Sequence, residues 1–300
     1  MPTLVLPPRF TPDTIAISQA AELAGWSVER LSSWRVPDWL RGQDVTLYGE
    51  PLFAAVVAGD LGLVLLEPPF DWLVTLPAEY RKREIRLTTL RDARQLRQPA
   101  FVKPADDKCF LAGVFSSGEQ LPGGDVLPGR TAVLIAEPVR WAVEFRCFSL
   151  ERTVIDLSPY LRHGELAQSP EGKWEDARTE QAREFAAAVV SDDSVALPPA
   201  IVIDVGLIEG RGWAVVETNA AWGSGIYGCD PAAVLRVVRR ACLPRDQVSA
   251  ADRPWVIERS GEDLEDLAAR DYPLTTADLD QIGPQRRPPD SWHAEESKPF

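Results

Sequence analysis

The sequence predicts an α+β protein in which a small α/β unit precedes a larger region of hairpins. Two observations support this class. Over residues 1–85, short apolar runs alternate with helix-like segments, which is typical of a mostly parallel sheet. From residue 86 onward the apolar runs follow one another more directly, as the strands of hairpins do, with helices only in places.

The first unit divides into elements at its turn residues. Leu4–Leu6 is expected to form a strand. Thr11-Pro12-Asp13 is a typical helix start, and we expect this helix to end at Ala24 because Gly25 follows. Three more strands are expected in this unit, at Val28–Leu31, Val45–Tyr48 and Leu63–Leu66.

The second region is expected to contain three helices, at Thr89–Leu96, Glu175–Val190 and Pro231–Cys242. Its strands are bounded by prolines, glycines and tight turns. They are expected at Ala100–Pro104, Cys109–Phe115, Ala132–Ala136, Val143–Leu150, Thr153–Leu157, Ile201–Leu207 and Trp213–Asn219.

Length and charge suggest how these elements are organised. The 300 residues allow about two domains. We expect an α/β domain at 1–85, a larger domain at 86–245 and an extension at 246–300. The extension carries thirteen acidic and six basic residues, so it contributes −7 of the net charge of −13, and loose packing is expected there.

Composition excludes several classes of function. A net charge of −13 argues against nucleic acid and anionic membranes as partners. The N-terminus does not resemble a signal peptide, and the longest apolar runs are the length of strands, so a cytoplasmic protein without a membrane partner is expected. The four cysteines form no CxxC pair and are expected to be reduced core thiols.

Two strand-like runs flank a strong hairpin signal, Glu209-Gly210-Arg211-Gly212. A turn centred on Gly210-Arg211 places Asp204 opposite Glu217, with Cβ atoms about 5 Å apart. Asn219 then lies on the same face. Carboxylates that close repel each other unless a cation lies between them, and hard oxygen ligands suit Mg²⁺. The alternative is that both acids point into water, although the residues around them are apolar.

Two of only five lysines flank one short loop. Lys103 ends the apolar strand Phe101–Pro104, from where its ammonium could reach a phosphate. Lys108 follows five residues later. The alternatives are that Lys103 only extends from a strand end and that Lys108 is a solvated loop residue.

A third segment runs from Ala136 through Glu137-Pro138-Val139 into a new strand. Alternation along that strand places Glu144 and Arg146 on one face. They could hold a ribose hydroxyl and a transferring phosphate. A routine cross-strand salt bridge is equally compatible with this spacing.

Together these segments resemble the ATP-grasp superfamily of Mg-ATP-dependent carboxylate–amine ligases. The resemblance covers residues 86–245. It implies an α+β ATP-grasp fold, in which two α+β subdomains grip ATP, preceded by a small α/β pre-ATP-grasp unit. It also implies ATP and Mg²⁺ as cofactors and a small-molecule or peptide substrate, and it leaves a homodimer open.

The resemblance assigns a role to each segment. The implied roles are nucleotide-phosphate contact for Lys103, adenine recognition by the hinge at Glu137, Pro138 and Val139, ribose binding for Glu144, magnesium binding for Asp204, Glu217 and Asn219, and a substrate-side loop at Gly223-Ser224-Gly225.

The sequence departs from the superfamily pattern in three places. The loop after Lys103 lacks glycines, so Lys108 is expected to supply charge there. The arginine often found two residues before the first magnesium aspartate is replaced by Val202, and Arg146 could take its phosphate role. An upstream basic residue is expected at the α-phosphate, and the candidates are Arg81, Lys82 and Arg83.

The function that follows is a ligase that joins a carboxylate to an amine of an amino acid, peptide or protein through an acylphosphate. Lys103 and Arg146 are its expected catalytic residues. Two alternatives stay open: a nucleotide-binding interaction protein with little turnover, and a small-molecule phosphotransferase. Trp222 and Tyr227 are either substrate contacts or buried aromatic residues.

Overall fold

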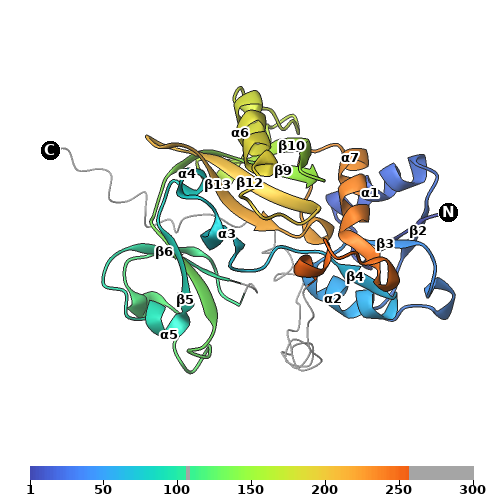
Figure 1. Cartoon of the computed structure of the whole chain (residues 1–300), viewed down its shortest axis with the longest axis horizontal. Helices are drawn as coiled ribbons and strands as arrows, with labels where there is room; N and C mark the ends of the chain where they lie inside the picture. Colours follow the sequence, from blue (N-terminus) through green and yellow to red (C-terminus); the bar gives the residue numbers. More distant parts are fainter. Residues whose placement is uncertain (106–108, 257–300) are drawn as a thin grey trace.

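A computed structural model describes residues 1–105 and 109–256 of the chain. Lys108 and residues 257–300 of the acidic extension therefore lie outside the described residues. Figure 1 shows a central sheet with helices on both sides, a smaller sheet beside it, and the N-terminal unit at the opposite end.

The N-terminal unit contains a parallel sheet of order β2-β1-β3. Its strands are β1 (Thr3–Leu6), β2 (Ser27–Arg30) and β3 (Val45–Leu47), and its helices are α1 (Pro12–Leu23) and α2 (Pro51–Asp60). The predicted parallel sheet and first helix are confirmed: the Thr11 hydroxyl accepts a hydrogen bond from the Thr14 N–H and caps α1. The fourth strand, β4 (Leu63–Leu65), instead pairs antiparallel with β14 (Cys242–Pro244), because the chain returns to this edge after its last helix.

The smaller sheet is antiparallel and has the order β5-β8-β6-β7. Two short helices, α3 (Trp72–Thr75) and α4 (Ala78–Arg81), lead into it. Its elements are β5 (Ile85–Thr89), α5 (Leu90–Ala93), β6 (Ala100–Pro104), β7 (Gly113–Phe115) and β8 (Ala132–Ala136). The helix α5 and the strand β7 are shorter than predicted, while β6 and β8 have their predicted bounds.

The central sheet has the order β11-β10-β9-β12-β13 and antiparallel pairing between the neighbouring strands. Its strands and its two covering helices are β9 (Trp141–Leu150), β10 (Thr153–Arg162), β11 (Glu165–Leu166), α6 (Thr179–Ser191), β12 (Ala200–Ile208), β13 (Gly212–Asn219) and α7 (Pro231–Ala241). The predicted hairpins and both helices are confirmed, with ends shifted by a few residues.

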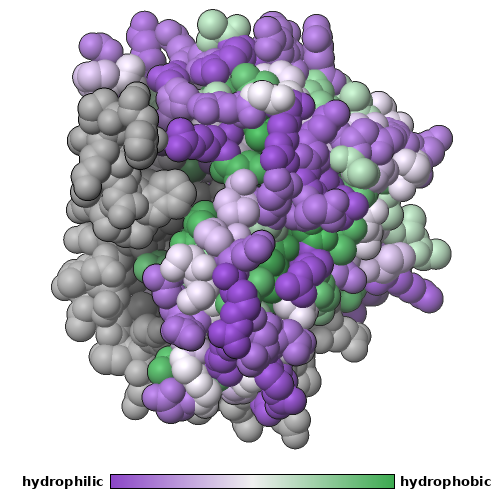
Figure 2. Space-filling model, turned by 90° about the vertical axis from the view of Figure 1, so that its left-hand side faces the viewer, coloured by the Kyte–Doolittle hydropathy of each residue, from purple (hydrophilic) through white to green (hydrophobic). Residues whose placement is uncertain are grey.

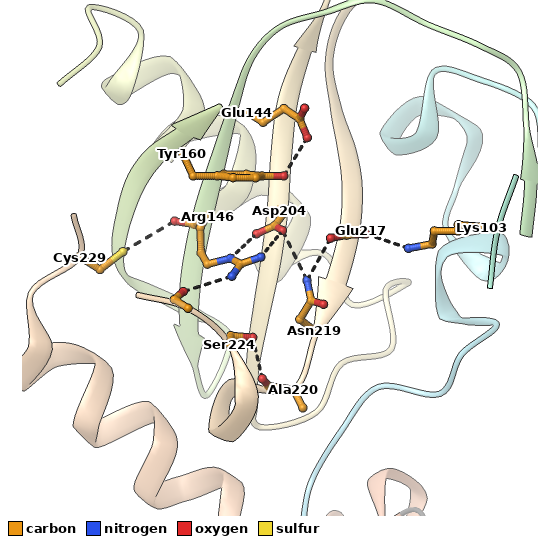
Figure 3. A network of polar contacts seen from close by, with 11 residues as sticks. Lys103, Glu144, Arg146, Tyr160, Asp204, Glu217, Asn219, Ala220, Ser224 and Cys229 are labelled. Carbon is orange, nitrogen blue, oxygen red and sulfur yellow. Dashed lines mark hydrogen bonds and ion pairs between the residues drawn. The ribbon is translucent and has the colours of Figure 1, made fainter. Parts of the chain in front are cut away.

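Alternation along β9 and β12 divides the sheet into two faces. Odd-numbered residues such as Phe145 and Ile203 pack with Ala186 of α6. On the opposite face, Phe148 and Val202 pack with α7 and the N-terminal unit in one shared core. Polar residues appear on this second face in the middle of the strands, where Arg146 and Asp204 lie (Figure 3).

The chain after β14 is packed up to residue 256. Asp252 is 3% exposed and accepts hydrogen bonds from the side chains of Arg240 and Ser249. The expectation of loose packing therefore does not hold for residues 246–256.

The surface beside the smaller sheet is mainly hydrophilic, and its hydrophobic residues lie in small groups among polar ones (Figure 2). Within the described ranges, no helix combines the length and apolar character that crossing a bilayer requires. All four cysteines are free thiols; three are buried, but Cys109 is only partly buried, contrary to the expected core position.

Candidate functional site

The hairpin of β12 and β13 positions three of the predicted site residues. Asp204 lies opposite Glu217, as predicted. The turn itself differs from the prediction: Ile208 pairs with Gly212, so the connection holds three residues, with Gly210 and Gly212 at φ of 74° and 91°.

A β-bulge between Asp204 and the neighbouring pair Val205–Val215 compensates for this turn. It leaves Val216 as an extra residue in β13, and one extra residue reverses the face to which the following side chains point. Val215 packs into the core beneath α6, whereas Glu217 lies on the face of Asp204. The bulge therefore brings the two carboxylates together.

Asp204 and Arg146 form a buried bidentate ion pair across β12 and β9. Arg146 donates from Nε to Oδ1 of Asp204 at 2.9 Å and from Nη2 to Oδ2 at 2.7 Å. The side chains are 0% and 9% exposed for Asp204 and Arg146. Of the two interpretations of Arg146 left open by the sequence, the cross-strand salt bridge is present, with Asp204 and not Glu144 as its partner.

Glu217 connects the central sheet with the smaller one. Lys103, at the end of β6, donates from Nζ to Oε2 of Glu217 at 2.8 Å. Asn219 Nδ2 lies 3.4 Å from both Glu217 Oε1 and Asp204 Oδ2. Figure 3 shows the resulting row of alternating charges from Lys103 to Arg146.

Aromatic rings and a loop carbonyl surround the Arg146 guanidinium. It lies 5.4 Å from the ring centre of Tyr160 and 5.0 Å from that of Tyr227, and Nη1 donates to the Gly225 carbonyl at 3.1 Å. Burial alone would lower the pKa of Arg146, but the charge and hydrogen bonds of Asp204 hold that pKa well above its ordinary value. Arg146 thus remains a cation.

Glu144 and Glu137 occupy different environments. Glu144 is 2% exposed and accepts a hydrogen bond from the Tyr160 hydroxyl at 2.8 Å. Glu137 points away from the network and pairs with Arg211 at the hairpin tip, which lowers the pKa of Glu137. Glu137 therefore lies in the hinge between β8 and β9 with its side chain outside the charge row, as do Pro138 and Val139 with their irregular backbone.

The three upstream basic candidates separate in the structure. Arg83 donates to the carbonyls of Val215 and Val216 at 2.7 and 2.9 Å. Arg81 donates to the Ile85 carbonyl at 3.4 Å, and Lys82 ends α4 with a φ of 51°. These contacts give Arg83 a structural position at the edge of β13.

Sequence reasoning missed the N-terminal unit's contribution and the tyrosines. Asp13, in the first turn of α1, accepts a hydrogen bond from the Ile226 N–H at 3.2 Å, and burial is the main cause that raises its pKa. Tyr48 donates to the Ser224 carbonyl at 2.8 Å. No local pattern indicates these contacts, since each joins residues far apart in the chain. Trp222 is a buried core residue, whereas Tyr227 lies against Arg146.

The donor set fits a hard divalent cation. Asp204, Glu217 and Asn219 supply two carboxylates and an amide whose polar atoms meet within hydrogen-bond range. No group of three His, Cys, Asp or Glu side chains suited to a metal occurs elsewhere in the described residues. The carboxylate repulsion expected from the sequence is already balanced by Arg146 and Lys103.

Comparison with known families identifies the class to which this fold belongs. The sequence matches the model of an ATP-grasp domain family, the second family of its clade, over residues 80–237. The chain therefore belongs to this family of ATP-grasp domain proteins, and the predicted α+β ATP-grasp fold is confirmed. No similar sequence was found among curated proteins.

Several solved structures are similar to this one. They include a RimK domain ATP-grasp protein from Sphaerobacter thermophilus, with 12% identity, 79% of this chain and 99% of that chain covered, and a TM-score of 0.49. D-alanyl-alanine synthetase A from Vibrio cholerae has 14% identity, coverage of 79% and 93%, and a TM-score of 0.47. The macrocyclase MdnC from Microcystis aeruginosa, bound to its precursor peptide MdnA, has 11% identity, coverage of 79% and 99%, and a TM-score of 0.44.

Proposed function

We propose that this protein is a Mg-ATP-dependent ligase that joins a carboxylate to an amine through an acylphosphate. The observation that carries the proposal is the row of charges from Lys103 through Glu217 and Asp204 to Arg146, which connects the two sheets. Cations that can pair with phosphates lie there beside carboxylates that can hold a divalent cation. Membership of the ATP-grasp family supports the same class of reaction.

Asp204, Glu217 and Asn219 are the residues that would hold Mg²⁺, which when bound neutralises charge on the nucleotide phosphates. The hinge backbone at Glu137, Pro138 and Val139 would contact adenine, and Glu144 the ribose. We propose these roles from the family resemblance.

The proposed reaction has two steps. A substrate carboxylate oxygen bonds to the γ-phosphorus of ATP, the bond from that phosphorus to the β,γ-bridging oxygen breaks, and ADP leaves. The amine nitrogen then bonds to the acyl carbon, the carbon–oxygen bond to phosphate breaks, and the amine's proton passes to phosphate or water. Lys103 and Arg146 stabilise the negative charge that develops on the phosphoryl oxygens.

A labelled carboxylate tests this chemistry. The protein is incubated with Mg-ATP, amines and pooled amino acids or peptides whose carboxylates carry ¹⁸O. The proposal expects ADP, a condensed product and one ¹⁸O atom in the released phosphate. Formation of AMP, or a stable phosphorylated product without condensation, would refute the ligase reaction, and the latter outcome would identify a phosphotransferase.

The assigned metal site has its own test. Glu217→Ala should abolish metal-dependent nucleotide binding and turnover. Glu209→Ala is the matched control, because Glu209 lies at the exposed tip of the same hairpin and should leave both unchanged. Unchanged activity in Glu217→Ala would refute the assignment.

A nucleotide-binding protein with little turnover is a second candidate. It is favoured by the Arg146–Asp204 pair, since Arg146 already occupies both carboxylate oxygens of Asp204. Tight Mg-ATP binding without ADP release, whatever carboxylate and amine are supplied, would support this candidate against both enzymes.

A further inference from the structure

Arg83 contacts an unusual backbone feature at the outer edge of β13. Its Nη1 donates to the Val215 carbonyl at 2.7 Å and its Nη2 donates to the Val216 carbonyl at 2.9 Å. Consecutive carbonyls of a regular strand point to opposite edges, so one guanidinium bonds both only where the strand is distorted. The distortion is the bulge that leaves Val216 without a partner on β12.

This bulge decides which face of the sheet receives Glu217. Trp213 and Val215 point into the core under α6. Glu217 and Asn219 have the same parity as those residues, and without the extra residue they would also point toward α6. With it, both lie beside Asp204.

We propose that Arg83 is a positioning residue that selects the bulged form of β13 and thereby assembles the metal–nucleotide site. The inference rests on the proposed function of Asp204, Glu217 and Asn219. The planar guanidinium presents two donors in a fixed geometry that matches two neighbouring carbonyls, which a lysine ammonium does not do.

Neighbouring groups hold the Arg83 guanidinium in this orientation. It lies 5.0 Å from the ring centre of Trp141, and Nη1 also donates to the Arg81 carbonyl at 3.0 Å. Its hydrogen bonds are therefore directed at backbone carbonyls, which separates it from the role of a phosphate ligand. The competing explanation is that Arg83 only attaches the segment before β5 to the sheet.

A double-mutant cycle distinguishes the two explanations. Binding of Mn²⁺ with ADP is measured by electron paramagnetic resonance for the full chain, for Arg83→Lys, for Glu217→Gln and for the double variant. A positioning role predicts that Arg83→Lys weakens Mn²⁺ binding by about tenfold or more, as loss of an outer partner of a metal ligand does. In the Glu217→Gln background the same change should have less than about a twofold effect.

Arg152→Lys is the matched control. Arg152 also donates to backbone carbonyls, those of Val190, Asp192 and Val195, but at a position remote from the charge row. It should leave Mn²⁺ binding within about twofold of the unmodified chain. An equal loss in Arg83→Lys and Arg152→Lys, or an equal effect of Arg83→Lys with and without Glu217, would overturn the proposal.

Hydrogen–deuterium exchange separates this inference from the proposed function. In the metal-free protein, Arg83→Lys should increase amide exchange over residues 214–219, and Arg152→Lys should not. If the unmodified chain binds no Mn²⁺ with ADP, the proposed function fails, while faster exchange still supports the positioning of β13. Unchanged exchange in Arg83→Lys would overturn the inference whatever the metal affinity.

Discussion

Replacing Asp204 by asparagine should destabilise the fold by about 3–5 kcal/mol, because removal of one member of a buried ion pair leaves the other charge uncompensated. Asp204 is 0% exposed, and the Arg146 side chain that would remain is 9% exposed. Asparagine keeps the size of the side chain, so the change removes charge and hydrogen bonds without opening a cavity.

The structure supports this magnitude from a second direction. Arg146 donates two hydrogen bonds to Asp204, at 2.9 and 2.7 Å. Hydrogen bonds to charged groups each contribute about 1.5–3 kcal/mol. Asparagine can still accept one of them, and the bond to the Gly225 carbonyl is unchanged. The remaining loss is one charged hydrogen bond plus the buried, uncompensated guanidinium, and together they fall in the same range.

Urea unfolding of the metal-free protein, followed by tryptophan fluorescence, measures the change as a lower midpoint at constant slope. Asp44→Asn is the control, because the Asp44–Arg239 pair has a similar distance of 3.0 Å but exposed side chains, and it should cost less than about 1 kcal/mol. Equal costs for the two substitutions would refute the reasoning. A further check is Asp204→Leu combined with Arg146→Met, which should recover most of the lost stability.

The hairpin illustrates how far the sequence predicts this site. Alternation in two apolar runs correctly placed Asp204 opposite Glu217, although the predicted two-residue turn was wrong. The correct pairing results from a longer turn together with a bulge at Val216. The bulge is contacted by Arg83, which precedes Val216 by 133 residues, so no local pattern could have indicated it.

The charges of the site illustrate the limit more generally. Repulsion between two carboxylates correctly indicates that positive charge lies nearby, but it does not identify the source. Here Lys103 comes from the smaller sheet and Arg146 from β9, and both contacts depend on tertiary structure. Alternation predicted that Glu144 and Arg146 share a face, yet it could not show that Arg146 pairs across the sheet with Asp204.

Two predictions concern parts of the fold outside the charge row. Asp176 accepts hydrogen bonds from two arginine side chains and one backbone N–H, and the arginine hydrogen bonds hold its pKa well below the ordinary value. Its roughly 2–3 kcal/mol of stabilisation is therefore complete above about pH 5 and is lost as the pH falls below about 4; urea unfolding of Asp176→Asn against the unmodified chain should show a difference that shrinks in acid, and a constant difference would contradict the assignment. Gly118→Ala should destabilise the smaller sheet by at least about 1–3 kcal/mol, because an added Cβ would lie 2.3 Å from the Arg94 carbonyl, which is backbone and cannot rotate away. Gly113→Ala, whose Cβ would meet nothing within 4 Å, is the control, and equal thermal midpoints for the two variants would show that the segment around residue 118 moves aside at little cost.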